Sequence, residues 1–207
     1  MASRKQPTIS ANRAAEIFRD TLSVRRINWL DNQFPKMTDV WEFLAADNPQ
    51  VRIKRYNTDN EYSHKRAAVV ALDELIALTA SNQFWDRACQ GALFQNFVLA
   101  HEMGHLILDH HASGAVVKNF ALFDDATGVA NIPPTVEELE ANYAAVFFQC
   151  GVTLLAPGLN AKTDAFRIAA RAFSDPHYVE KAIRLCQLEA FLEEWRKLST
   201  GIQRVVL

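Results

Sequence analysis

Apolar residues fall three or four positions apart in several stretches of the chain, the spacing that places side chains on one face of a helix. The first stretch predicts a helix over about 13–24, which Ser10 or Asn12 can cap. A shorter helix is predicted over about 37–46, and a long helical segment over about 83–111. The first half of the chain is therefore predicted to be mainly helical.

Two short apolar runs between these helices are typical of β-strands, and they cover Val51–Tyr56 and Ala67–Leu72. The charged stretch 57–66 between them predicts a hairpin-like connection. Basic side chains gather on and beside the two strands, which indicates a solvated sheet edge, with a docking surface for an acidic partner as the alternative. These basic residues are Arg52, Lys54, Arg55, Lys65 and Arg66.

An irregular or partly stranded stretch over 113–131 separates this region from the next predicted helix. Thr135 and Glu138 have the spacing of a capping box, in which the two residues satisfy each other's backbone N–H groups. They predict the start of a helix of about 15 residues. Pro157-Gly158 closes that helical region.

Two further helices fit 163–173 and 176–197, the second with Asp175 as N-cap and Pro176 at its first position. The rhythm of 166–185 also fits a helix-turn-helix DNA reader. Because the turn contains Asp175 and Pro176 and the segment has no basic excess, packing helices are the favoured interpretation. The elements together predict a helix-rich α+β domain with a small β-sheet.

Composition agrees with this class and adds two exclusions. The chain has 207 residues, 49% of them hydrophobic, and a formal charge of −2. This length predicts one domain, and the near-neutral charge gives no global reason to expect nucleic-acid binding. The longest uncharged run, Ala141–Ala161, contains polar residues and a proline, so it suits a buried helix and turn better than a membrane span.

Three cysteines, Cys89, Cys150 and Cys186, lie far apart and form no C-x-x-C pair. Each is surrounded by apolar residues, so buried and reduced core thiols are expected. The basic N-terminus is not followed by the apolar segment of a secretory signal. These features predict a cytoplasmic protein.

The motif that carries chemistry is His101-Glu102-Met103-Gly104-His105, an H-E-x-x-H set inside the long predicted helix. At 100° per residue and 1.5 Å rise, His101 and His105 lie on one helix face about 6 Å apart, so both imidazoles can bind one Zn²⁺. Glu102 is turned about 100° from His101, where it can act as a general base toward water without being a ligand. The spacing therefore predicts a catalytic zinc site.

Catalytic zinc usually has three protein ligands, and His111 stands where the longer H-E-x-x-H-x-x-G-x-x-H motif has its third histidine. Leu108 replaces the glycine that turns the chain in that motif, and no methionine follows Met103 to form the methionine turn of that class. His110 and His111 are therefore interpreted as residues near a helix C-terminus, where the helix dipole favours them.

Three glutamates of the next helix compete as third ligand. Helical projection places Glu140 with Tyr143 and Phe147 on the apolar face, whereas Glu138 lies about 160° away and is assigned to the capping box, and Glu137 lies at the margin. A carboxylate on an apolar face is costly unless it is paired or bound to a metal. Glu140 is therefore the predicted third ligand, with a glutamate that only favours the helix dipole as the alternative.

Three segments together resemble the ImmA/IrrE family of metallopeptidases: Phe97–Leu108, Glu140–Ala145 and Leu154–Pro157. The similarity in element order covers roughly residues 12–157. The family's third ligand is the glutamate of a Glu-Ala-Asn-like motif, which the resemblance carries onto Glu140. The stretches from His105 to Glu140 and from Glu140 to Pro157 are longer than the family pattern, and this departure bears on the shape of the substrate cleft.

The resemblance implies a zincin-like metallopeptidase domain over residues 1–157, with C-terminal helices in 158–207 packed on the same domain. It also implies a zinc-dependent endopeptidase that cleaves or inactivates a cognate helix-turn-helix repressor, so that the partner is a DNA-binding protein and not DNA. The alternative is a non-catalytic zinc-containing module that holds a repressor or toxin. The presence of Glu102 favours the enzyme, because a binding module needs no general base.

Peptide hydrolysis also needs a donor for the oxyanion of the tetrahedral intermediate. Tyr143, His177 and Tyr178 are the candidates in this chain. For each of them, packing or a surface position is the alternative interpretation.

Overall fold

The computed structural model describes residues 8–28, 30, 33–57, 67–72, 75–110 and 135–199. This part of the chain is mostly helical and contains one three-stranded sheet, so the predicted α+β class is confirmed. None of its helices combines the length and the apolar character needed to cross a membrane.

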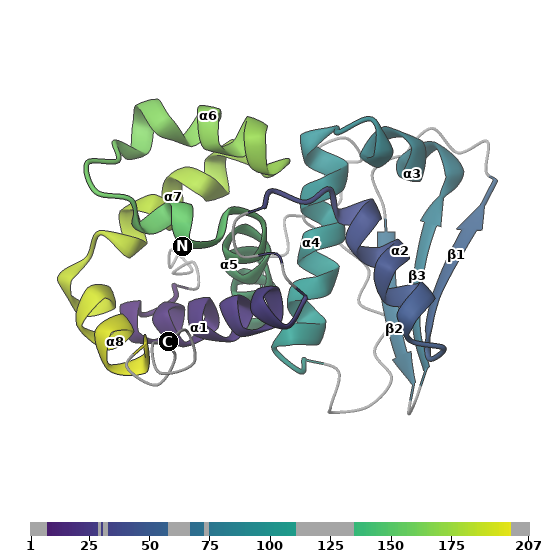
Figure 1. The fold of residues 1–207 in the computed structure, drawn as a ribbon, viewed down its shortest axis with the longest axis horizontal. Coiled ribbons are helices and arrows are strands. Elements are labelled where there is room, and N and C mark those ends of the chain that lie inside the picture. The colour runs from purple at the N-terminus through teal and green to yellow at the C-terminus, as the bar shows by residue number, and fades with distance from the viewer. Residues whose placement is uncertain are drawn as a thin grey trace, which may run out of the picture.

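Helices make up most of the described elements. In Figure 1, α4 lies in the middle, with the sheet, α2 and α3 on one side and the other helices on the opposite side. The strands are β1 (Val51–Tyr56), β2 (Ala67–Leu72) and β3 (Leu75–Ser81). The helices are α1 (Ala11–Ile27), α2 (Met37–Asp47), α3 (Asn82–Cys89), α4 (Leu93–Ile107), α5 (Val136–Cys150), the 3₁₀ helix η3 (Gly151–Leu155), α6 (Ala161–Ala172), α7 (Pro176–Cys186) and α8 (Glu189–Ser199).

The helix starts that the sequence predicts are largely confirmed. The Ser10 hydroxyl accepts from a backbone N–H in the first turn of α1, and the Thr135 hydroxyl does the same at the start of α5. Asp175 caps α7, with Pro176 in its first turn. Helices α6 and α7 pack against each other and bury apolar faces in the core, which agrees with packing helices.

Two predicted helices are each divided in two. The segment predicted over 83–111 is broken by Gly91, whose positive φ of 85° ends α3 and sends the chain into α4. The segment predicted over 176–197 breaks after Cys186, and α8 then packs along α1. Periodicity alone does not reveal such breaks, because the apolar spacing continues through them.

The strands pair differently from the prediction. β3, which the pattern does not predict, lies in the centre of the sheet in the order β1-β3-β2. It pairs parallel with β1 and antiparallel with β2, so β1 and β2 do not form the expected hairpin. The predicted sheet edge is confirmed for exposed Arg52, Lys54 and Arg55 on β1. Lys65, Arg66 and the stretches 58–66 and 113–131 lie outside the described residues.

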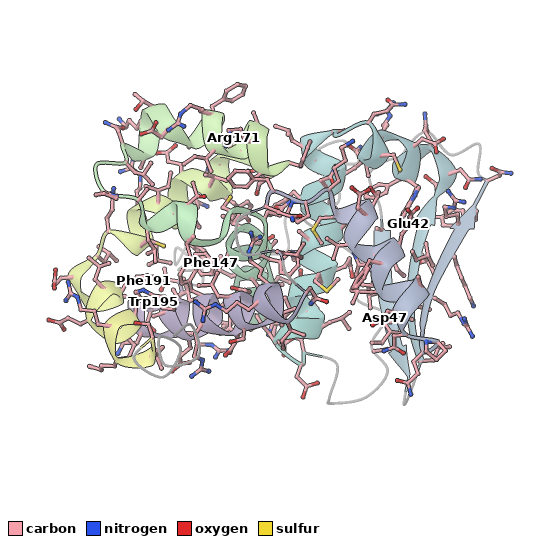
Figure 2. All side chains as sticks on the ribbon, viewed as in Figure 1. Glu42, Asp47, Phe147, Arg171, Phe191 and Trp195 are labelled. Atoms are coloured by element: carbon pink, nitrogen blue, oxygen red, sulfur yellow. The ribbon has the colours of Figure 1, made fainter. Side chains whose placement is uncertain are left out.

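An aromatic cluster joins the first, middle and last parts of the chain. The ring of Phe18 on α1 lies 5.0 Å from that of Phe147 on α5 and 5.0 Å from that of Trp195 on α8. Phe191, also on α8, is fully buried beside them. Figure 2 shows Phe147, Phe191 and Trp195 directed into the same region. The C-terminal helices thus share the hydrophobic core with α1 and α5.

Helices α4 and α5 approach closely because small residues lie between them. A Cβ added to Gly104 would lie 2.7 Å from the carbonyl oxygen of Ala141 and 3.1 Å from the Cβ of Ala144. Such distances leave no space for a side chain on this face of α4. The glycine of the H-E-x-x-H segment therefore permits the contact that brings α5 against the two histidines.

The cysteines agree only in part with the prediction. Cys150 and Cys186 are buried free thiols, and burial raises the pKa of Cys150 to about 12. Cys89 is also free but exposed, so the expected burial is wrong for this residue. It is the last residue of α3, and it is exposed although its neighbour Ala88 is fully buried in the core.

Candidate metal centre

The two histidines of the H-E-x-x-H segment lie side by side on a buried stretch of α4. His101 and His105 are 0% and 1% exposed. Their ring centroids are 4.6 Å apart, and the two Nε2 atoms are 2.9 Å apart. The prediction that helical spacing brings both imidazoles to one point is therefore confirmed.

Glu138, in the first turn of α5, completes the cluster. Its Oε2 lies 3.3 Å from Nε2 of His101, and its Oε1 lies 3.6 Å from Nε2 of His105. One donor atom from each of the three residues lies within 4.8 Å of the other two. His101, His105 and Glu138 therefore form a group that could hold a metal ion.

Glu140, the predicted third ligand, is not part of this cluster. Its two carboxylate oxygens each accept a hydrogen bond of 2.8 Å from the guanidinium of Arg13 on α1. These bonds hold the pKa of the Glu140 carboxyl below its usual value. Two residues along a helix correspond to about 200° of rotation, so Glu138 faces α4 while Glu140 faces α1.

The burial of α5 explains why the sequence pattern favours Glu140 and not Glu138. The helix is buried on nearly all sides from Glu140 to Cys150, so an apolar face does not reveal which side meets the histidines. Glu138 was assigned to the capping box, but only its backbone N–H bonds to Thr135 Oγ1, at 3.2 Å. Its carboxylate is directed to the histidines, whereas Glu137 is exposed.

Asn142 has a role that the sequence did not reveal. It is fully buried on α5, and its Oδ1 lies 2.8 Å from Nδ1 of His101. Because its amide nitrogen bonds to the hydroxyl of Tyr178 at 3.2 Å, Oδ1 is the atom turned to the histidine, and it only accepts. The usable signal was its position four residues after Glu138, which places both on one helix face.

This contact fixes the proton of His101. Burial lowers the pKa of His101 to about 4, so the imidazole is neutral near pH 7 and carries one N–H. That N–H is on Nδ1, because Asn142 Oδ1 accepts it. The Nε2 atom therefore presents a lone pair to His105 and Glu138, as a metal ligand requires.

Glu102, the predicted general base, is buried beside the cluster at 2% exposure. Its Oε2 accepts a hydrogen bond of 2.9 Å from the backbone N–H of Val69 on β2. Its Oε1 is buried with no hydrogen-bond partner among the described residues. Burial raises the pKa of Glu102 well above its usual value. The sheet thus holds one of the two carboxylate oxygens of Glu102.

These observations fit a bound metal cation. Two imidazoles and a carboxylate are the donor types of three-ligand metal sites in enzymes. Lone pairs and negative charge turned toward one another in a buried place repel unless a cation lies among them. The unpartnered oxygen of Glu102 beside the cluster is a further buried acceptor that a water in such a site would satisfy.

His110 belongs to this network as well. The Nδ1 atoms of His110 and His105 are 2.9 Å apart, and Nε2 of His110 lies 3.4 Å from Glu140 Oε2. Burial lowers the pKa of His110. The prediction of a residue near a helix end is correct in position, since α4 ends at Ile107, but the side chain contacts a cluster histidine. His111 lies outside the described residues.

The three predicted oxyanion donors lie in different surroundings. Tyr178 is stacked on Phe97, with ring centroids 5.2 Å apart, and burial raises its pKa to about 12. Its hydroxyl is connected to His101 through Asn142. Tyr143 packs near Phe147 in the core, and the ring of His177 lies 5.6 Å from that of Tyr178. Their role in catalysis stays a prediction.

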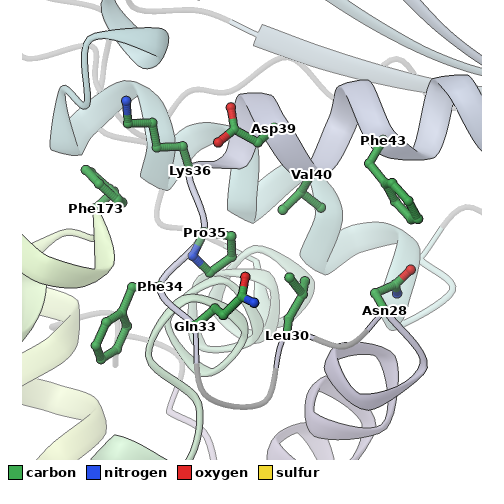
Figure 3. Close-up of a pocket in the computed structure, with 10 residues that line it drawn as sticks. All are labelled: Asn28, Leu30, Gln33, Phe34, Pro35, Lys36, Asp39, Val40, Phe43 and Phe173. Atoms are coloured by element: carbon green, nitrogen blue, oxygen red, sulfur yellow. The ribbon is translucent and has the colours of Figure 1, made fainter.

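An apolar pocket of about 510 Å³ is separate from the metal cluster, since no cluster residue lines it. Figure 3 shows its walls, which come from the segment after α1, from α2 and from the end of α6. The lining residues are Asn28, Leu30, Gln33, Phe34, Pro35, Lys36, Asp39, Val40, Phe43 and Phe173. Its single carboxylate and lack of histidine make it no candidate for the same chemistry.

Comparisons of the chain with models of protein families, with curated proteins and with solved structures find no match. The geometry of the cluster and the motifs of the sequence are therefore the basis for a function.

Proposed function

We propose that the protein is a zinc-dependent endopeptidase. The observation that carries this proposal is the convergence of His101, His105 and Glu138 beside the buried carboxylate of Glu102. Two histidines and a glutamate, with a non-ligand glutamate next to the first histidine, are the residue set of zinc hydrolases that use a three-ligand site. Zinc is preferred as the metal because it accepts mixed nitrogen and oxygen donors in four-coordinate sites.

The residues divide the work of hydrolysis among them. His101, His105 and Glu138 would hold the zinc, which when bound supplies Lewis acidity toward a peptide carbonyl and a water. Glu102 accepts a proton from the attacking water at Oε1 and passes it to the departing amine. The Val69 N–H holds Oε2 meanwhile, so the carboxylate keeps its orientation during both transfers.

The substrate class follows from the resemblance to ImmA/IrrE metallopeptidases in the segments 97–108, 140–145 and 154–157. On that basis we propose a cognate helix-turn-helix repressor as the protein substrate. The resemblance assigns Glu140 as the third ligand. We propose Glu138 instead, because Glu138 contacts the histidines and Glu140 contacts Arg13. Both glutamates belong to the Glu-Leu-Glu-Ala-Asn segment, so the change leaves the resemblance intact.

Co-expression with a helix-turn-helix repressor encoded beside the gene tests this function. The wild type is expected to cut the repressor, and Glu102→Ala is expected to leave it intact while keeping its zinc. Glu137→Ala, which changes an exposed glutamate, is the control and should cut as the wild type does. A repressor that is bound but intact with both wild type and Glu102→Ala would support the non-catalytic binding module instead.

A further inference from the structure

Nδ1 of His105 lies 2.9 Å from Nδ1 of His110, whereas Nδ1 of His101 faces the amide oxygen of Asn142. Two imidazole nitrogens at this distance share one proton, since one must donate and the other accept. Whether His105 can bind a metal through Nε2 therefore depends on which ring supplies the proton. The surroundings of His110 decide this.

The chain of contacts begins at Arg13. Its Nε and Nη2 donate to the two oxygens of Glu140, each at 2.8 Å, which is the paired geometry of a guanidinium and an ionised carboxylate. Arg13 bridges α1 to α5 in this way, and Glu16 accepts another of its N–H groups at 3.1 Å. Glu140 is thus held as an acceptor with no proton to give.

Glu140 in turn orients His110. Because Oε2 of Glu140 only accepts, the contact of 3.4 Å with Nε2 of His110 places the N–H on that nitrogen. The His110 side chain is 8% exposed, and its neutral ring then carries a lone pair on Nδ1. That lone pair accepts from Nδ1 of His105, which leaves Nε2 of His105 without a proton.

The backbone holds His110 in place for this contact. The chain leaves α4 through Asp109, whose φ of 54° is left-handed. The N–H of His110 bonds to the carbonyl of His105 at 3.0 Å, and the N–H of Asp109 to that of Leu106 at 3.2 Å. These two bonds form a Schellman motif, which turns the chain back so that the rings of His105 and His110 lie 5.1 Å apart.

We propose that Arg13, Glu140 and His110 are positioning residues that keep the proton of His105 on Nδ1 and leave its Nε2 lone pair for the metal. Asn142 holds the proton of His101 on Nδ1 in the same way. These contacts together leave no proton between the Nε2 atoms of His101 and His105. The inference rests on the proposed zinc site and assigns to Glu140 an indirect role instead of ligation.

Zinc affinity and histidine NMR test the proposal without any use of activity. Affinity is measured by competition with a chromophoric chelator in the full chain, for wild type, His110→Phe and Glu140→Gln. His110→Phe keeps a ring but removes the acceptor, and both variants are expected to lose about tenfold or more in zinc affinity. The matched control is Glu16→Gln, which removes the other carboxylate of Arg13 and should stay within about twofold of wild type.

The spectroscopic readout is the Nδ1–H proton of His105 in the zinc-loaded protein. In wild type and Glu16→Gln it should give a slowly exchanging resonance in nitrogen-edited spectra, and in His110→Phe this protection should be lost. Glu140→Gln keeps the size and shape of the Glu140 side chain, so this variant still tests the proposal if His110→Phe fails to fold. If wild type and both variants bind zinc equally well with the same Nδ1–H resonance, the positioning role is refuted and the zinc site stands. If the wild type binds no zinc, the proposed function itself fails.

Discussion

At the scale of single residues, the distinction between Glu138 and Glu140 decides the chemistry of the site. Glu140 is neutralised by the guanidinium of Arg13, so its charge is already compensated. Glu138 instead directs its two carboxylate oxygens at the Nε2 atoms of His101 and His105. A partly buried carboxylate directed at two imidazoles can be stabilised by a metal ion, so we propose Glu138 as the ligand and Glu140 as a supporting residue.

Asn142 provides the first prediction at this scale. Asn142→Ala removes the acceptor that fixes His101, so zinc affinity is expected to fall about 10–100-fold. The control is Gln149→Ala, which removes another fully buried amide of α5 whose partner is the carbonyl of Phe173. Both variants should lose stability, but only Asn142→Ala should lose affinity in a chelator competition. Equal affinities in the two variants would show that Asn142 is only a packing residue.

Residues joined by local geometry could be predicted from the sequence, and residues joined by packing could not. His101 and His105 share a helix face because they are four positions apart in one helix, so this contact was predicted. The approach of Glu138 depends on how α5 lies against α4, which no pattern within α5 records. The contact of Asn142 with His101 and that of His110 with Glu140 depend on the same packing.

At the scale of elements, the contact between α4 and α5 is what assembles the cluster. These helices are separated in sequence by residues 108–135, yet they carry all three members of the group that could hold a metal ion. Gly104 makes the close approach possible, because its missing side chain leaves space for the backbone of Ala141. The relative position of the two helices therefore determines whether the three side chains meet.

Gly104→Ala tests this dependence. The added Cβ would lie 2.7 Å from the Ala141 carbonyl oxygen, so α5 must move away from α4. We expect a loss of about 1–3 kcal/mol in stability, as for other overpacked sites. Zinc affinity should fall as well, since Glu138 moves with α5. Denaturant unfolding and chelator competition measure the two effects, and a variant with wild-type values in both would contradict the role of this contact.

The sheet shows where element prediction fails. β1 and β2 were predicted at their observed bounds, because each is a short apolar run. Their separation by β3 was not predicted, since the parallel pair β1–β3 joins residues more than twenty positions apart. Strand order depends on such long-range pairing and on the covering helices, of which α4 contacts β2.

At the scale of the whole molecule, a bound metal would join distant parts of the chain. The cluster connects α4 to α5, Arg13 connects α5 to α1, and the aromatic cluster around Phe18 continues to α8. A ligand that binds only the folded state stabilises it by mass action. Zinc is therefore expected to contribute to stability as well as to chemistry.

Removal of the metal tests this coupling. At zinc about 100-fold above Kd, binding stabilises the folded state by about 2.7 kcal/mol. For a protein of this size, we expect the Tm to fall by roughly 5–10 °C when a chelator removes the zinc. This change in Tm is measured by thermal unfolding, with circular dichroism as the signal. Glu138→Ala, which lacks a ligand, should show no such difference, and an equal difference in this variant would place the zinc elsewhere.

The most direct test of the metal centre is the zinc content of the purified chain after dialysis, measured by elemental analysis. The wild type and the control Glu137→Ala should each retain about one zinc per chain, because two histidines and Glu138 complete a three-ligand site. Glu138→Ala should retain less than about a tenth of that amount, since loss of one of three ligands weakens binding strongly. A wild type without zinc, or a Glu138→Ala variant that keeps as much as the wild type, would contradict the assignment.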